Sequence, residues 1–489
     1  MKLFSRLTVR LPFSIVWAGA LMICLWARDY PKPMPDDLYY IGAALHMAEG
    51  GDFSNPLIVR QEYPSHYYFV YPPTHSYALA SWLKFTGISD RAVRGFYMAW
   101  YFIAAVSTIA LLRKQGALRL WECLVPLGVC TALHATGLRT EALSVGATMA
   151  GYALVECLGF NLLANFFGML LLLLGASAAP RLAFFSGSLL VLSVGKLWLK
   201  AGSSKSRLLA VLPVLFAGAF ILGLFLWQID FRWSEFWHTF AVNARIFTTR
   251  TRLDRLLNFL NDNPYLNDSQ SPLLWALAAL LFFAWPKFKS DSALTGFAIL
   301  FGFLAEAIAR GLGAGALWYV VLALLLFSSH TAKHLPALAP RLTVALVFLF
   351  LLANAEIIAN EVQRFRGKIT NNRGDLFQAA LNLRVTKEHP VLIDAWTARY
   401  VYNYRIPDGF GDIQNAVRFP KNHIIMQWHP DDIYVIGPDN VQVLTDFSFL
   451  VQEVKIRSIF AMANRHIFCE PCRVYVIPAE ECRPRIERP

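Results

Sequence analysis

The sequence predicts a polytopic, all-α membrane domain followed by a small α/β domain outside the membrane. The first observation is composition: 56% of the 489 residues are hydrophobic and only 16% are charged, against about 25% charged in soluble domains. The second is that the hydrophobic residues gather in long runs, as membrane-spanning helices require. The third is that these runs stop near residue 361. We therefore predict a transmembrane domain over residues 1–360 and an extramembrane domain over residues 361–489.

The net charge of +12 does not by itself indicate nucleic-acid binding. Much of the Lys and Arg lies between apolar runs, where it reports topology. The remainder can meet anionic lipids or phosphate groups. The sequence has no basic–aromatic RNA signature, so we expect membrane lipids and no nucleic acid among the partners.

The first apolar run extends from about Leu11 to Trp26 and follows three basic residues. Ala18-Gly19-Ala20 resembles a signal-peptide cleavage site. Because the apolar run continues past it, we favour an uncleaved first helix whose N-terminus is cytoplasmic.

Further apolar runs bring the predicted number of spans to about eleven, and several are close to the minimum length for crossing a bilayer. They lie at about 95–112, 120–137, 142–157, 160–178, 182–199, 208–227, 272–285, 293–309, 315–329 and 341–359.

Lys and Arg gather in alternate connections between these runs, as expected for cytoplasmic loops. These basic groups are Arg113/Lys114/Arg119, Lys200/Lys205/Arg207, Lys287/Lys289 and Lys333/Arg341. The alternation places the first loop (27–90), the segment around Arg139, the loop 228–271 and the C-terminal domain together on the outer side. We expect this to be the periplasmic side of a bacterial inner membrane. Within the first loop, the segment Ser76–Phe85 is apolar but too short to span, so we predict an interfacial segment.

Short apolar segments predict the elements of the C-terminal domain. The helix is predicted at Leu376–Leu383, and the strands at Val391–Asp394, Ile433–Ile436, Val441–Leu444, Ile456–Ala461 and Arg473–Ile477. Cys469, Cys472 and Cys482 follow, and in an oxidising compartment at least two of them are expected to form a disulfide.

Two adjacent carboxylates, Asp36 and Asp37, open the first loop just after the first span. Asp36 can be an N-cap, because apolar residues with helical spacing follow it. It can also do chemistry, because a carboxylate can take a proton from an acceptor hydroxyl. The two roles are compatible.

Other polar and aromatic residues of the predicted outer loops are candidates for substrate binding. In the first loop they are Tyr40, Glu62, His66 and Tyr71. In the later loop, Arg245 lies among aromatic residues, a pattern that suits phosphate headgroups. The alternative for that later loop is a solvated amphipathic segment.

Arg139 and Glu141 lie where the third predicted span ends and the fourth begins. The pair can be a structural salt bridge or a helix cap. Charges at membrane depth also mark functional sites. An arginine can hold a departing phosphate in bidentate fashion, and a further carboxylate can orient that arginine or hold a divalent ion.

These motifs, in this order, resemble integral-membrane glycosyltransferases of the GT-C class, close to the protein O-mannosyltransferase and lipid A aminoarabinose transferase group. Asp36-Asp37-Leu38-Tyr39-Tyr40 resembles that family's Asp-Glu-x-x-Tyr motif. Tyr71-Pro72-Pro73, followed by Gly87-Ile88-Ser89 and Arg94, resembles its Tyr-Pro-Pro segment. Arg139-Thr140-Glu141 stands at its second-loop acidic motif, and Gly315–Tyr319 at a later Gly-rich aromatic segment.

The resemblance implies inverting transfer of a sugar from a polyprenyl-phosphate donor to a hydroxyl of a lipid, glycan or protein acceptor on the outer face. It assigns Asp36 as the base, with Asp37 second and Glu141 as a further catalytic carboxylate. It leaves room for a divalent cation (Mg²⁺, Mn²⁺ or Ca²⁺) on Asp37 and Glu141. Asp at position 37, where Glu is common, and Thr140, where Pro is frequent, leave open which carboxylate acts and whether a metal is needed.

Two other functions are considered. A transporter or flippase of lipid-linked sugars predicts charged residues at mid-span, for which Glu306 and Lys196 are candidates. A non-catalytic scaffold would bind a partner through its tail. Large polar loops on one side of the membrane favour the enzyme over both.

Overall fold

The computed structural model describes most of the helical part of the chain and the strands of the C-terminal part. The described ranges are 12–28, 30–31, 37–55, 67–117, 119–159, 161–246, 276–281, 290–310 and 315–365, with strands at 391–393, 410–412, 424–427, 435–436, 442–457, 462–478 and 483–484. Within the helices some side chains are left out, those of residues 37–39, 134–136 and 242–246 among them.

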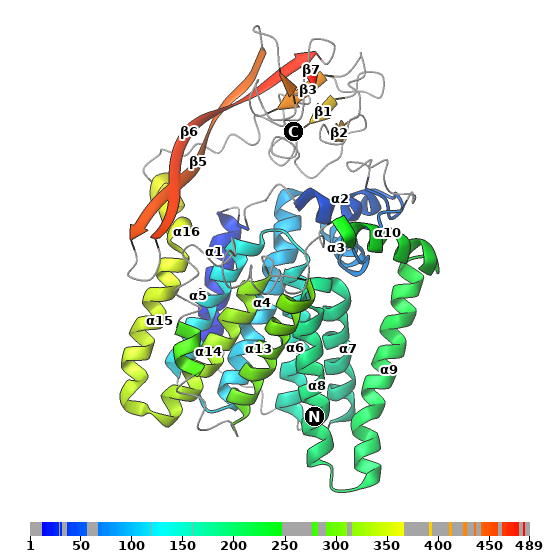
Figure 1. The fold of residues 1–489 in the computed structure, drawn as a ribbon, viewed down its shortest axis with the longest axis vertical. Helices are drawn as coiled ribbons and strands as arrows, with labels where there is room; N and C mark the ends of the chain where they lie inside the picture. Colours follow the sequence, from blue (N-terminus) through cyan, green and yellow to red (C-terminus); the bar gives the residue numbers. More distant parts are fainter. Residues whose placement is uncertain are drawn as a thin grey trace.

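Helices make up the first part of the chain (Figure 1). They are α1 (Phe13–Ala27), α2 (Asp37–Ala48), α3 (Thr74–Thr86), α4 (Asp90–Lys114), α5 (Arg119–Thr136), α6 (Glu141–Leu158), α7 (Leu162–Ala178), η1 (Pro180–Leu182), α8 (Ala183–Lys200), α9 (Ser204–Gln228), α10 (Trp233–Ile246), α13 (Asp291–Arg310), α14 (Ala316–His334), η3 (Pro336–Leu338), α15 (Ala339–Ala353) and α16 (Ala355–Phe365).

Several helices are long and apolar enough to cross a membrane, so the chain is an integral membrane protein. Among the described residues there are six, at Arg91–Lys114, Pro180–Lys200, Ala210–Gln228, Asp291–Ala309, Ala316–His334 and Pro336–Ala353. Two shorter apolar helices, Phe13–Ala27 and Leu162–Ala178, also coincide with predicted spans.

Local sequence explains where these helices begin and end. The Ser89 hydroxyl caps α4 by accepting a hydrogen bond from the Ala92 amide at 3.1 Å, which satisfies one of the open N–H groups of the first turn. Arg113 and Lys114 occupy the last turn of α4, where cations favour the helix dipole. Asn161 caps α7 in the same way through the Ala164 amide.

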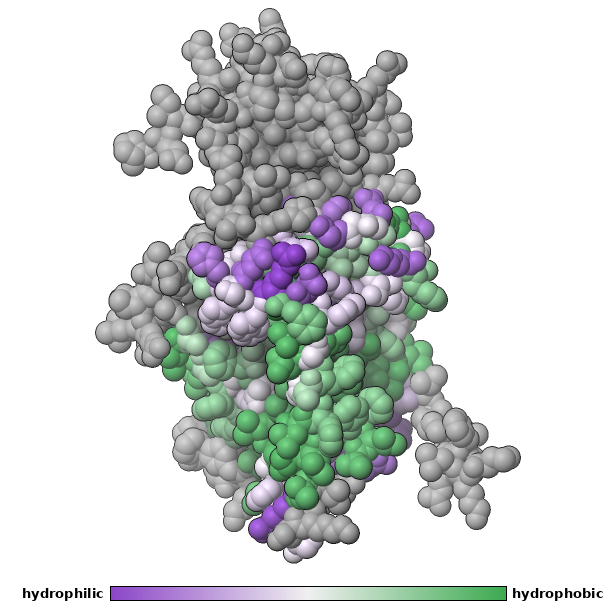
Figure 2. All heavy atoms as spheres, turned by 90° about the vertical axis from the view of Figure 1, so that its right-hand side faces the viewer, coloured by the Kyte–Doolittle hydropathy of each residue, from purple (hydrophilic) through white to green (hydrophobic). Residues whose placement is uncertain are grey.

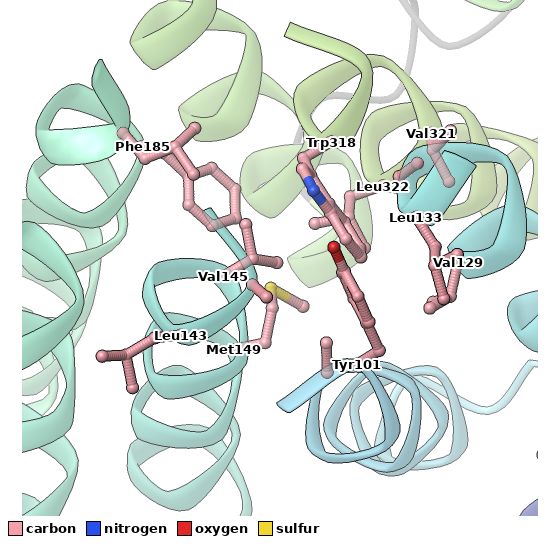
Figure 3. Close-up of a cluster of buried hydrophobic side chains, with 14 of the residues drawn as sticks. Tyr101, Val129, Leu133, Leu143, Val145, Met149, Phe185, Trp318, Val321 and Leu322 are labelled. Atoms are coloured by element: carbon pink, nitrogen blue, oxygen red, sulfur yellow. The ribbon is translucent and has the colours of Figure 1, made fainter. Parts of the chain in front are cut away.

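The core of the bundle is built around α6 and α14. Every residue of α14 from Ala316 to Ala332 is buried. Tyr101 of α4 stacks on Trp318 of α14, with ring centroids 5.6 Å apart, and Figure 3 shows this pair beside side chains of α5, α6 and α8. Gly151 lets α6 lie against the backbone of α7, because an added Cβ would overlap it. Such small residues permit close helix contacts in membranes.

Ion pairs around the buried Glu156 join helices at the end of the bundle that lies away from α2. Lys196 of α8 contacts Glu156 of α6 at 3.0 Å and Asp291 of α13 at 3.2 Å. Lys114 of α4 reaches the same Glu156 at 3.4 Å. The transporter hypothesis requires Lys196 at mid-span. The structure instead places it in a group of ion pairs that joins the ends of α4, α6, α8 and α13.

The opposite end of the bundle carries the short helices α2, α3 and α10 (Figure 1). We call it the α2 end. The prediction of an apolar, non-spanning segment at Ser76–Phe85 corresponds to α3. Figure 2 shows hydrophilic residues gathered near the α2 end, above a broad hydrophobic surface.

The predicted span at 341–359 overlaps the candidate span Pro336–Ala353, but its helix ends earlier than predicted. The structure ends α15 at Ala353 and starts α16 at Ala355. Asn354 lies between them, and its side-chain amide donates to the Thr131 hydroxyl at 2.8 Å and to the Phe350 carbonyl at 2.8 Å. Asparagine competes for backbone hydrogen bonds in this way, which breaks a helix that hydropathy alone would continue.

The C-terminal strands form a five-stranded sheet and a two-stranded sheet. The strands are β1 (Val391–Ile393), β2 (Phe410–Asp412), β3 (Ile424–Gln427), β4 (Val435–Ile436), β5 (Gln442–Arg457), β6 (Met462–Pro478) and β7 (Arg483–Pro484). The larger sheet has the order β2-β1-β3-β6-β5, and β4 pairs with β7. Of the strand predicted at 456–461, Ile456 and Arg457 lie on β5, and the other residues lie outside the described part of the chain. The predicted helix at 376–383 lies outside the described residues.

The long strand β6 also bears on the cysteines. Cys469 and Cys472 both lie on β6, opposite Leu450 and Phe447 of β5. Residues three apart on a strand have Cα atoms about 10 Å apart, beyond the roughly 7 Å that a disulfide bridges. A disulfide in this domain is therefore expected to join Cys482 to one of the two. Peptide mapping without reduction checks this, and a Cys469–Cys472 bond would contradict β6.

Candidate functional site

Residues from three separate segments meet at the α2 end. Tyr40 of α2 and Tyr71 of the first loop have ring centroids 4.7 Å apart. The Arg139 guanidinium carbon lies 5.7 Å from the centre of the Tyr40 ring. Tyr40 and Arg139 are both buried. We call Tyr40, Tyr71, Arg139 and Glu141 the tyrosine–arginine cluster.

The electrostatics of the cluster keep the Tyr40 hydroxyl protonated. Burial raises the pKa of Tyr40 well above its usual value, and the neighbouring Tyr71 and Glu141 raise it further. Arg139 and Arg181 act in the opposite direction. Tyr40 can therefore donate a hydrogen bond at neutral pH beside a cationic side chain, which suits an anionic ligand.

Glu141 occupies the first turn of α6, where its charge is favoured by the helix dipole. Its side chain is buried and lies 3.4 Å from the Thr140 hydroxyl. Gly315, just before α14, faces it closely: an added Cβ would lie 3.2 Å from the Glu141 Cγ and 3.3 Å from Leu182. The connection before α14 therefore packs against the Glu141 side chain.

A hydrogen bond from α4 holds the segment that carries Arg139. The Tyr101 hydroxyl donates to the Gly137 carbonyl at 3.1 Å, and Gly137 has a positive φ of 56°, which glycine adopts without strain. Because Tyr101 is itself fixed by stacking on Trp318, this hydrogen bond sets the course of the chain two residues before Arg139.

α4 also holds the chain that leads to the Asp pair. Arg94 is buried and donates from Nη1 to the Pro31 carbonyl at 3.0 Å. One turn on, the Tyr97 hydroxyl lies 3.1 Å from Nε2 of His75 in α3. Burial lowers the pKa of His75 to about 3, so this imidazole is neutral and acts as a structural link. Arg94, which the motif comparison singled out, therefore has a positioning role.

The first loop also rests on the junction of α9 and α10. The Thr74 hydroxyl donates to the Gln228 side-chain oxygen at 3.1 Å, and the Tyr77 hydroxyl donates to the Gln228 carbonyl at 3.1 Å. Arg232 lies over the Tyr67 ring at 4.6 Å. These contacts hold the segment that contains Tyr71 from both sides.

Several predicted site residues lie outside what the structure describes. Asp36, Glu62 and His66 are not described at all. Asp37 begins α2 and Arg245 lies on α10, but their side chains are not described. Of the predicted residues, the structure brings together Tyr40, Tyr71, Arg139 and Glu141.

Sequence reasoning missed Arg181. It lies in η1, whose neighbour Leu182 packs near Gly315 and Glu141, and it acts electrostatically on Tyr40. The sequence did carry one signal. Arg181 is a basic residue at the predicted outer end of a span, whereas basic residues are expected in the cytoplasmic loops.

The residues assigned to a divalent cation do not form a complete site in the described part of the chain. Of Asp37 and Glu141, only the Glu141 side chain is described. No three His, Cys, Asp or Glu side chains among the described residues lie close enough together to hold a metal ion.

The proximity of Gly315 to Glu141 can be tested by placing side chains of increasing size at position 315. Gly315 has φ −65°, which alanine and valine adopt freely, so any effect is steric. Gly315→Ala is expected to be tolerated with a small loss of thermal stability. Gly315→Val is expected to cost about 1–3 kcal/mol, as overpacked sites do, and to displace Glu141. Thermal unfolding of both variants measures this, and equal stability of the two would contradict the packing.

The hydrogen bond from Tyr101 can be tested by removing one oxygen. Tyr101→Phe keeps the stacking on Trp318 but leaves the buried Gly137 carbonyl without this donor. The expected loss of stability is about 1–3 kcal/mol, the cost of an unsatisfied buried group. Thermal unfolding measures it. A stability equal to the unmodified chain would show that another donor replaces the hydroxyl.

Comparison with known proteins gives similarity of structure without similarity of sequence. No family model and no curated protein sequence matches the chain. The apo structure of ArnT from Cupriavidus metallidurans is similar with a TM-score of 0.50 and 13% identity, covering 94% of this chain and 97% of that one. The same protein bound to undecaprenyl phosphate has a TM-score of 0.46 and 11% identity over the same shares.

A third structure, the Archaeoglobus fulgidus oligosaccharyltransferase in complex with Zn and sulfate, has a TM-score of 0.43 and 13% identity, covering 81% of this chain and 62% of that one. The match to apo ArnT extends over nearly the whole of both chains. The chain therefore has the fold of the integral-membrane glycosyltransferases of the GT-C class, the class that its motifs resemble.

Proposed function

We propose that the chain transfers a sugar from a polyprenyl-phosphate donor to the hydroxyl of a lipid, glycan or protein acceptor. The observation that carries the proposal is the tyrosine–arginine cluster, in which a buried guanidinium and a protonated phenol lie together at the α2 end of a GT-C fold. The ArnT that shares this fold has also been solved with undecaprenyl phosphate. Because fold alone does not give function, the proposal rests on the cluster.

In this mechanism the cluster binds the donor phosphate. The Arg139 guanidinium donates two parallel hydrogen bonds to phosphate oxygens, and its burial strengthens them. Tyr40 donates a further hydrogen bond, since its hydroxyl stays protonated. Glu141, two residues after Arg139, is the carboxylate assigned to orient the guanidinium. These donors stabilise the negative charge that develops on the leaving phosphate.

Asp36 is assigned as the base, with Asp37 as the second candidate. Asp36 accepts the proton of the acceptor hydroxyl as the acceptor oxygen forms its bond to the anomeric carbon. The bond from that carbon to the phosphate oxygen breaks with its electron pair, and polyprenyl phosphate leaves. Attack from the face opposite to the leaving group inverts the anomeric configuration.

The topology proposed for this reaction has about eleven spans, with the α2 end and the domain 361–489 both in the periplasm of a bacterial inner membrane. A cysteine introduced at Asn440, in a chain whose native cysteines are replaced by serine, tests it. A membrane-impermeant maleimide is expected to label this cysteine in cells whose inner membrane is intact. Labelling that requires permeabilisation would place the domain in the cytoplasm.

The activity is tested with the purified full chain in vesicles that contain a polyprenyl-phosphate sugar pool. Transfer of the sugar to an acceptor, with release of polyprenyl phosphate, is the expected result. A transporter or flippase would instead move the intact lipid-linked sugar between leaflets. Loss of donor from the outer leaflet without any free polyprenyl phosphate would identify that alternative and contradict the enzyme.

A further inference from the structure

Large aromatic side chains are exposed where α9 ends and α10 begins. Trp227 is 60% exposed, Phe231 70%, Trp233 49% and Trp237 55%. We call these four residues the aromatic corner. Several large exposed aromatic side chains within eleven residues of the chain indicate a surface with a partner, because soluble proteins seldom leave large apolar groups together in water.

The backbone of the corner keeps an unusual conformation. Asp230 and Phe231 both have positive φ angles, 52° and 56°. This left-handed region is disfavoured for a bulky aromatic residue, and such strain persists only where the surroundings enforce it. The amide of Phe231 donates to the Leu226 carbonyl at 2.8 Å, so the turn is closed onto the end of α9 while the Phe231 ring remains exposed.

The inner face of α10 packs against the rest of the protein. The exposure of its outer face is therefore not caused by poor packing of the helix. Phe236 is buried, with its ring 5.1 Å from Phe225 of α9 and 5.7 Å from Phe69 of the first loop. On the outer face Trp233 and Trp237 stack on each other, with centroids 6.1 Å apart and planes within 12°. Both tryptophans nevertheless keep about half of their surface exposed.

The position of the corner in the chain indicates what covers it. Trp227 lies on the last turn of the candidate span Ala210–Gln228. The same helix exposes Phe216, Phe220 and Leu222, so its outward surface is the one that lipid tails cover. The aromatic corner continues this surface at the end of the span, the level at which tryptophan prefers to lie.

The charged residues beside the aromatic corner also suit a position at the membrane interface. Arg232 lies 3.4 Å from Asp230 and 3.4 Å from Glu235, and all three are more polar than hydrocarbon tolerates. A layer that takes indole rings and ion pairs side by side is the headgroup region of a bilayer.

We propose that the aromatic corner is an interfacial anchor that inserts into the headgroup–acyl boundary of the bilayer. Through Gln228, Arg232 and Phe236 it would hold the segment Tyr67–Tyr77 at a set depth. The partner is the lipid surface, and the proposal does not rest on the transferase activity.

Fluorescence quenching in vesicles tests the anchor directly. The full chain is reconstituted in phosphatidylcholine and phosphatidylglycerol, with acyl chains brominated either near the headgroup or near the middle of the bilayer. The chain has 14 tryptophans, so the corner's share of the emission must be separated from that of the others. It is obtained by subtracting the emission of W233F/W237F from that of the unmodified chain. That share is expected to lose most of its intensity with shallow bromines and little with deep ones.

Two single replacements calibrate the measurement. Trp198, at the end of α8, is 43% exposed and lies under Arg207, so the share lost in W198F should be quenched by shallow bromines. Trp121 is 1% exposed, so the share lost in W121F should resist both lipids. If the Trp233/Trp237 share resists both brominated lipids, the proposal is overturned. In that case, quenching by aqueous iodide would show that the aromatic corner is exposed to water. A lack of quenching by iodide would show that it is covered by protein.

Discussion

Replacing Asp36 by asparagine is expected to abolish sugar transfer while leaving the protein folded and inserted. Asparagine is nearly isosteric with aspartate and can still accept an N-cap hydrogen bond, so the start of α2 at Asp37 should persist. It cannot accept the proton of the acceptor hydroxyl. A general base contributes about a hundred- to ten-thousandfold in rate, and a loss of that size is expected in transfer from a polyprenyl-phosphate sugar pool.

Two further replacements separate catalysis from capping. Asp37→Asn is expected to be milder if Asp36 is the base. Asp52→Asn, in the same loop but beside His46, should leave transfer unchanged. Thermal unfolding is measured alongside each assay. Full activity of Asp36→Asn would refute the base assignment, and a parallel loss of activity and stability would favour the capping role.

Arg139→Lys is expected to give the second largest effect. Lysine keeps the charge, but it loses the planar fork that grips a phosphate in bidentate fashion and the flat face that lies over Tyr40. The loss of one hydrogen bond to a charged group is worth about 1.5–3 kcal/mol. This predicts a fall in kcat/KM for the lipid-phosphate donor of about ten- to a hundredfold.

The control for Arg139→Lys is Arg119→Lys, at the exposed start of α5 in the opposite end of the bundle. It should change neither donor use nor stability. Varying the donor and the acceptor separately distinguishes the roles: Arg139→Lys should raise KM for the donor more than KM for the acceptor. An equal change in both would mean that Arg139 supports the fold of the α5–α6 connection rather than the phosphate.

Hydropathy was sufficient to predict the six candidate membrane spans of the described residues. The predicted runs at 95–112, 182–199 and 293–309 correspond to α4, α8 and α13, because transfer of a helix into lipid depends on the sum of its own side chains. Helix ends were less predictable. Asn354 breaks the predicted run 341–359 through a hydrogen bond to Thr131, which is far away in the sequence.

The chain by itself determined which residue types could bind a phosphate and in which connections they lie. It could not give their mutual distances. Tyr40 reaches Arg139 only because α2 and the α5–α6 connection are packed at one end of the bundle, and Arg181 joins them from η1. Gly315 meets Glu141 for the same reason. Local pattern depends on each residue and its neighbours, whereas these pairings depend on how distant helices pack, and only the tertiary structure decides that.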